Sequence, residues 1–114
     1  MSNYKTLIVF QKADELAFQI YNVINTFPKS ELYGLTSQIR RSALSVPTNI
    51  VEGYARKSKK ELLQFINIAF ASHAETEYLF SFSKRLGYCK TEFLSIEDLI
   101  SEVGKLLWGF RRSL

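Results

Sequence analysis

Apolar residues recur at steps of three and four along almost the whole chain, and this spacing is the feature that most restricts its fold. One apolar set occupies residues 7–26, a second 35–57, a third 58–86 and a fourth 95–112. Each set places its apolar side chains on one side of a helix and polar residues opposite. No segment has the alternating pattern of a half-buried strand. The sequence therefore predicts an all-α chain with four amphipathic helices.

Local signals mark the ends of the predicted helices. Pro28 stops the first helix, because proline removes a backbone donor and disfavours helical geometry in the residue before it. Ser58, with Glu61 three residues later, has the spacing of a capping box at the start of the third helix. Gly87 is the expected C-cap glycine of that helix. Ser95 is expected to cap the last helix.

The connectors between consecutive helices are short, which makes sequential helices antiparallel neighbours. We therefore predict a single domain over residues 1–114, an antiparallel up-down-up-down four-helix bundle. Pro47 lies inside the second helix, where a proline costs about 3 kcal/mol unless the helix bends. We expect the second helix to be kinked near Pro47.

Few side chains in this sequence suit catalysis or metal binding. Cys89 is the single cysteine and His73 the single histidine, which excludes an intramolecular disulfide and a Cys/His metal cluster. The Glu-x-x-His spacing of carboxylate metal bundles is absent, and no nucleophile has a second histidine to activate it. The sequence predicts a protein that is not an enzyme and that holds no metal and no cofactor.

The start of the chain lacks the apolar segment and cleavage site of a signal peptide. No apolar run approaches the roughly 18–20 residues that span a bilayer. We expect a protein of the reducing cytoplasm with no membrane partner.

Polar residues recur along one face of the second helix. Those spaced by four, three and four residues are Arg41, Ser45, Thr48 and Glu52. A carboxylate of the third helix that faced an arginine here would form a charge-assisted pair. We predict a structural polar network that fixes the helix register, made of Arg41, Ser45, Asn49, Glu52 and Glu75. The alternative is that these residues contact a partner or a ligand.

The middle of the chain is basic. Residues 37–60 hold six Lys or Arg and one acid, in a chain of net charge +4. The candidate phosphate-binding residues are Arg40, Arg56, Lys57, Lys59 and Lys60. In an antiparallel bundle Lys5, Arg111 and Arg112 would share one end with the turn between the second and third helices. Such a cluster binds phosphates by charge; the alternative is a solvated, basic helix end.

Sixteen aromatic residues are many for 114 residues, and most have the spacing of core positions. Those expected nearer the surface are Tyr4, Tyr33, Tyr54, Tyr88 and Trp108. Exposed rings can stack on nucleic-acid bases, although oligomer contacts are their commoner use.

The segment from residue 35 to 79 resembles a known family. Its motif positions are Leu35, Gln38, Arg40, Arg41 and Ser42, residues 45–53 (SVPTNIVEG), Arg56, Ser58, Ala69, Ser72 and Glu75. Val9, Gln11, Lys12, Ala13, the Phe27-Pro28 step and the Gly87-Tyr88 step extend the likeness over nearly the whole chain. The chain thus resembles the four-helix-bundle proteins associated with intervening sequences of bacterial 23S ribosomal RNA genes.

The resemblance implies a left-handed four-helix bundle that assembles as a ring, typically a homopentamer, without catalytic activity. The chain is also similar to the accessory proteins of diversity-generating retroelements, which are basic rings that bind nucleic acid and a reverse transcriptase. From the charge and the resemblance together we predict a self-associating bundle that binds RNA or DNA. The alternative is a scaffold whose ring recruits a protein partner without binding nucleic acid.

Overall fold

The computed structural model describes residues 3–89 and 93–114. Over these residues the chain forms four α-helices, α1 Ile8–Ile24, α2 Leu35–Tyr54, α3 Lys59–Arg85 and α4 Phe93–Ser113. Short 3-10 turns, Tyr4–Thr6 and Lys29–Glu31, come before α1 and α2. No β-strand occurs in this part of the chain. The predicted all-α class is confirmed.

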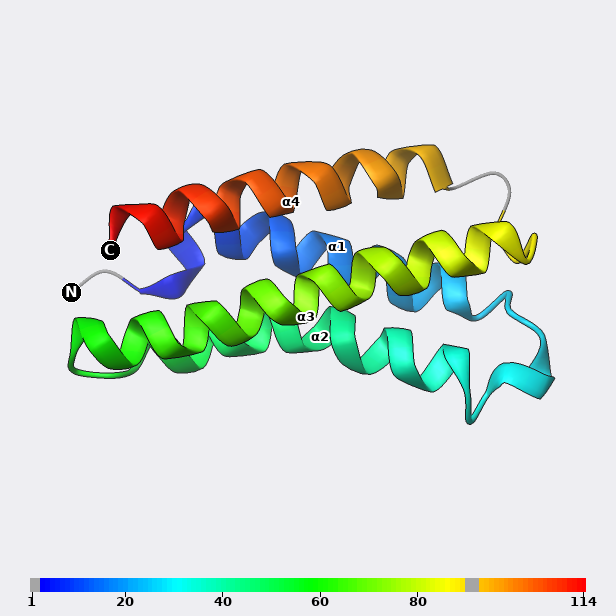
Figure 1. Cartoon of the computed structure of the whole chain (residues 1–114), viewed down its shortest axis with the longest axis horizontal. Helices are drawn as coiled ribbons and strands as arrows, with labels where there is room; N and C mark the ends of the chain where they lie inside the picture. Colours follow the sequence, from blue (N-terminus) through cyan, green and yellow to red (C-terminus); the bar gives the residue numbers. More distant parts are fainter. Residues whose placement is uncertain (1–2, 90–92) are drawn as a thin grey trace.

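Consecutive helices run in opposite directions (Figure 1). The α2–α3 turn and the two ends of the chain lie at one end of an elongated body of 43 × 25 × 20 Å. The α1–α2 connection lies at the other end. This arrangement brings segments that are far apart in the sequence to the same end of the bundle.

The core is mainly aliphatic and draws on every helix. Ile20 of α1, Ile39 and Ile50 of α2, Ile66 of α3 and Val103 of α4 are each 0% exposed. Burying a side chain of this size contributes about 1.5–3 kcal/mol relative to leaving it in water. The apolar stripes of the sequence therefore meet along the bundle axis.

Both ends of α3 carry the capping residues that the sequence predicts. The Ser58 hydroxyl accepts a hydrogen bond from the Glu61 amide at 3.1 Å, which is the predicted N-cap. Gly87 has φ 78°, a left-handed geometry that favours glycine. The Gly87 amide donates to the Lys84 carbonyl and the Tyr88 amide to the Ser83 carbonyl, as in a Schellman motif. The N-cap predicted at Ser95 is wrong, because α4 already includes Phe93.

Pro47 is buried inside α2, which continues as one helix from Leu35 to Tyr54. Because proline has no amide hydrogen, the Ala43 carbonyl one turn earlier lacks its usual helical donor. The kink near Pro47 stays a prediction.

The α2 and α3 helices approach closely where α2 ends. A Cβ atom added to Gly53 would lie 2.8 Å from the Phe65 Cβ and 3.0 Å from a Leu62 methyl carbon. Real Cβ atoms essentially never come this near to other heavy atoms. The missing side chain of Gly53 therefore permits this approach.

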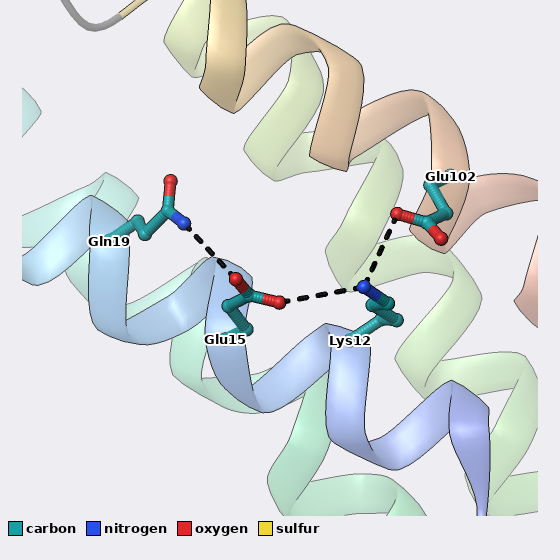
Figure 2. Close-up of polar contacts among 4 residues, drawn as sticks. All are labelled: Lys12, Glu15, Gln19 and Glu102. Carbon is teal, nitrogen blue, oxygen red and sulfur yellow. Dashed lines mark hydrogen bonds and ion pairs between the residues drawn. The ribbon is translucent and has the colours of Figure 1, made fainter.

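Lys12 of α1 forms two ion pairs at the surface, one within α1 and one with α4 (Figure 2). The Lys12 ammonium lies 3.8 Å from a Glu15 oxygen and 3.9 Å from a Glu102 oxygen of α4. Gln19 donates to the second Glu15 oxygen at 3.4 Å. Such half-exposed pairs contribute about 0–1 kcal/mol each. Lys12 therefore has an acidic partner on each of the two helices.

Candidate nucleic-acid interface

The α2–α3 turn and the segments near both chain ends meet at one end of the bundle (Figure 1), and all of them carry cationic residues. We call this group of cations the basic end and define it as Lys5, Arg56, Lys57, Lys59, Lys60, Arg111 and Arg112. All but Arg111 are exposed, and Arg111 is half-buried. The antiparallel topology therefore brings together the cations that the sequence predicted would meet here.

The charge of the protein is concentrated at the basic end. The segments that meet there, residues 3–6, 52–61 and 111–114, hold seven Lys or Arg against two acids, Glu52 and Glu61. The rest of the chain holds the remaining eight Lys or Arg and nine acids. In the described part of the chain, the ion pairs within 4.0 Å involve Lys12 and Lys84 and no member of the basic end. These seven cations are therefore free to meet anionic groups.

The arginines of the basic end lie against aromatic rings. The guanidinium carbon is 4.7 Å from the ring centroid for Arg56 on Phe65 and 4.9 Å for Arg112 on Trp108. Arg111 lies 4.2 Å from the centroid of Phe70, and donates to Asn67 at 3.4 Å. A guanidinium on a ring face keeps N–H donors at its edge. These contacts orient the arginines without neutralising them.

Helix dipoles account for part of the basic end. Arg111 and Arg112 occupy the last turn of α4, where cations are favoured. Lys59 and Lys60 occupy the first turn of α3, where the dipole disfavours cations. A purely structural role therefore does not explain why lysines occupy these two positions. An anion bound beside Lys59 and Lys60 would offset the repulsion between their charges and the helix dipole.

Arg40 lies apart from the other predicted phosphate contacts. It lies fourteen residues before Tyr54, the last residue of α2, which is about 21 Å along the helix, and Arg56 follows that end of α2. Its guanidinium carbon is 5.8 Å from the centroid of Tyr21 of α1. The predicted set of five therefore divides into the basic end and a single arginine nearer the opposite end, because each residue of a helix adds about 1.5 Å along its axis.

Arg40 lines a shallow groove along α2 that has a volume of about 470 Å³. Among its lining residues are Tyr21, Arg40, Arg41, Ser45, Asn49 and Glu52. The Arg41 guanidinium donates to the Ser37 hydroxyl at 3.3 Å. Four of the five predicted network residues therefore share this groove, and Glu75 is not among its lining residues.

The hydrogen bonds of this region differ from the expected carboxylate–arginine pair. The Ser45 and Ser72 hydroxyls are 2.8 Å apart and join α2 to α3. The Asn49 amide donates to the Ser45 carbonyl at 2.8 Å and lies 2.9 Å from the Ser45 hydroxyl. Among the described residues no ion pair joins Glu75 to Arg41, and both side chains are exposed. The short hydroxyls, rather than the charges, bridge the two helices.

A second bridge between α2 and α3 was missed by the sequence reasoning. The Thr76 hydroxyl lies 2.9 Å from the Ser42 hydroxyl and 2.9 Å from the Ser72 carbonyl, and Thr76 is 0% exposed. The available signal was a pair of small polar residues on one face of each helix, Ser42 and Ser45 three residues apart and Ser72 and Thr76 four residues apart.

His73 is buried between α3 and α4. Its Nε2 lies 2.8 Å from the Ile100 carbonyl oxygen, and since a carbonyl only accepts, Nε2 carries the proton. The buried Nδ1 has no hydrogen-bond partner among the described residues. Burial lowers the pKa of His73 from its ordinary 6.5, against weaker opposing effects of the Ile100 bond and of Glu77. The imidazole is therefore neutral at pH 7.

The lowered pKa of His73 predicts a pH-dependent stability. Above pH 6.5 the imidazole is neutral in both the folded and unfolded states, and its contribution is fully present. Below that, the unfolded chain binds the proton more readily, so the free energy of unfolding falls. Urea unfolding between pH 7.5 and 5 will show a steeper loss for the natural protein than for His73→Gln. Equal losses in the two proteins would contradict this prediction.

His73 forms the floor of a groove between α3 and α4, which we call the α3–α4 groove. Its volume is about 400 Å³. Its lining includes Phe70, His73, Ala74, Ser101, Gly104 and Trp108.

Of the five aromatic residues predicted nearer the surface, Tyr33 is 94% and Trp108 49% exposed, while Tyr4, Tyr54 and Tyr88 are half-buried.

The described residues contain no group of three or more His, Cys, Asp or Glu side chains placed to hold a metal ion. Within the same residues, none of the helices combines the length and the apolar character needed to cross a bilayer.

The fold and the basic end define a class of protein, an all-α four-helix bundle with a concentrated positive surface. The model of the family described as 23S rRNA-intervening sequence protein matches residues 5–109. This chain belongs to that family.

A solved structure has the same fold. It is the crystal structure of a protein of unknown function from the S23 ribosomal protein family of Bacteroides thetaiotaomicron. This chain is 29% identical to it over 91% of this chain and 98% of that one, with a TM-score of 0.83. No curated protein matches this chain.

Proposed function

We propose that this protein is a non-enzymatic, self-associating bundle of the cytoplasm that binds RNA or DNA through its basic end. The observation that carries the proposal is the convergence of seven cations that have no carboxylate partner within 4.0 Å among the described residues. Nucleic-acid phosphates are the polyanion that such a surface binds by releasing counterions.

The unpaired charge of the basic end argues for a bound anion. Like charges that lie close together repel one another, so a cluster of cations without a bound anion lowers the stability of the protein. Of the seven described cations outside the basic end, Lys12 and Lys84 are paired with acids, and the other five are spread over several elements rather than gathered at one end. Phosphates placed beside Lys59 and Lys60 would also interact with the N-terminal end of the α3 dipole.

The experiment measures binding of a labelled structured RNA and of a duplex DNA by fluorescence anisotropy over a series of salt concentrations. We expect the logarithm of the binding constant to fall linearly with the logarithm of salt, by about 0.7–0.9 per phosphate contacted. Absence of binding even at low salt would reject the proposal.

Self-association, which the resemblance implies as a homopentamer, is supported by large apolar side chains at the surface. Phe18 is 69% exposed, Leu94 66% and Tyr78 61%. Light scattering coupled to size-exclusion chromatography will give the mass of five chains. A mass of one chain at every protein concentration would contradict self-association.

A protein-interaction scaffold is the second candidate. Phe18, Tyr21 and Leu44 line an open groove between α1 and α2, away from the basic end. This candidate predicts a partner protein that stays bound after nuclease treatment and binds equally to variants of the basic end.

A further inference from the structure

We propose that the basic end continues into a surface for single-stranded nucleic acid, where an unstacked base packs against Trp108 beside the α3–α4 groove. The neighbouring phosphates meet Arg111 and Arg112. This inference rests on the proposed nucleic-acid binding and adds the strand state that the site accepts.

The aromatic groove and the basic end are continuous. Phe70 lines the α3–α4 groove and also lies 4.2 Å beneath the guanidinium of Arg111. Trp108 lines the groove and lies 4.9 Å from the guanidinium of Arg112. Trp108 and the two arginines are separated by three and four residues on α4, so they share a helix face. A strand that contacts the arginines therefore passes the indole.

The groove has room beside the indole. Trp108 is 49% exposed, although it is the largest apolar side chain in the molecule. Gly104, one turn before it, has no side chain to cover His73, and a Cβ there would lie 3.3 Å from the His73 Nε2. The volume of about 400 Å³ is open to solvent at the surface. A flat ring would therefore pack on the part of the indole that Arg112 leaves exposed.

The combination of cations and an exposed ring favours a single strand over a duplex. Bases in a duplex are stacked on one another, so a duplex presents its phosphates to the protein but not its base faces. Single strands offer both, and grooves that combine positive charge with aromatic rings bind them with little sequence preference. The surface therefore binds single-stranded nucleic acid through phosphate contacts and through base stacking. A duplex makes only the phosphate contacts.

The occupant is inferred from charge. The arginines beside Trp108 and Phe70 have no acidic partner within 4.0 Å among the described residues. A neutral or basic partner would leave these arginines uncompensated when it covered the rings. A phosphate on the strand compensates them.

The experiment uses the full-length protein and three probes of equal length, an oligothymidine, an abasic oligodeoxynucleotide and a duplex. The abasic probe keeps the phosphates and removes the bases. Because Trp108 is the single tryptophan, its intrinsic fluorescence reports stacking directly. We expect oligothymidine to quench this fluorescence and to bind roughly tenfold more tightly than the abasic probe. The duplex and the abasic probe will quench this fluorescence much less, because their phosphates contact Arg112 but no base packs on the indole.

Variants separate the ring from the charge. Trp108→Leu will weaken binding of oligothymidine roughly tenfold more than it weakens binding of the abasic probe, whose loss is limited to the contact that orients Arg112. The matched control is Tyr33→Leu, which removes a 94% exposed ring at the other end of the bundle and will change neither affinity.

Two outcomes would overturn the inference. Equal binding of oligothymidine and the abasic probe, with unchanged tryptophan fluorescence, would reject base stacking and leave charge-based binding intact. Absence of binding by all three probes at low salt would reject the proposed function, and the inference with it.

Discussion

Replacing Arg56, Lys59 and Lys60 together by alanine will weaken nucleic-acid binding roughly 100-fold at low salt. The slope of the logarithm of the binding constant against the logarithm of salt will fall by about 2 for a single strand, because three phosphate contacts are lost. The three side chains are exposed and have no ion-pair partner in the part of the chain that the structure describes. Anisotropy titrations over a range of salt concentrations measure both quantities.

A control with the same loss of charge comes from the opposite end of the bundle. Lys29, Lys84 and Arg85 are exposed there, and their replacement by alanine lowers the net charge equally. We expect this control variant to keep the salt slope of the natural protein. If both triple variants lost the same affinity, binding would depend on total charge, and the assignment to the basic end would be wrong.

Gly53→Ala will destabilise the bundle by about 1–3 kcal/mol, the usual cost of overpacking. The added Cβ would lie 2.8 Å from the Phe65 Cβ. That atom is the stem of a side chain rather than its flexible end, so α2 and α3 must separate to make room. Urea unfolding of the two proteins gives the difference in the free energy of unfolding.

Gly109→Ala is the matched control, because a Cβ at Gly109 would meet no heavy atom within 4 Å. Alanine is the better helix former by about 1 kcal/mol, so this substitution will stabilise α4. Similar effects of the two substitutions would show that the cost at Gly53 is not caused by the contact with α3.

Gly53 also shows what a local sequence pattern cannot predict. The sequence places Gly53 near the end of a helix, where a glycine softens the helix. In the structure Gly53 is buried within α2, and Ala55 is the C-cap. The actual reason for a glycine lies in α3, nine residues and more further along the chain, at Leu62 and Phe65. No pattern within one helix contains that information.

The candidate site was predicted in part. The Lys and Arg of residues 56–60 are consecutive or nearly so, and the antiparallel topology was enough to place Lys5, Arg111 and Arg112 near them. Pairings between side chains were not predictable in this way. Arg41 was expected to face Glu75 and instead donates to Ser37, because the rotation of each helix about its axis decides which side chains meet.

By itself the sequence determined the helical class, the four apolar stripes and both ends of α3. These depend on spacing, on a capping serine and on a C-cap glycine, all of which act within a few residues. The tertiary structure decided which faces met. It placed His73 against the Ile100 carbonyl and Thr76 against Ser42, contacts that span 27 and 34 residues. Because such contacts depend on helix rotation and separation, they are fixed only when the whole core packs.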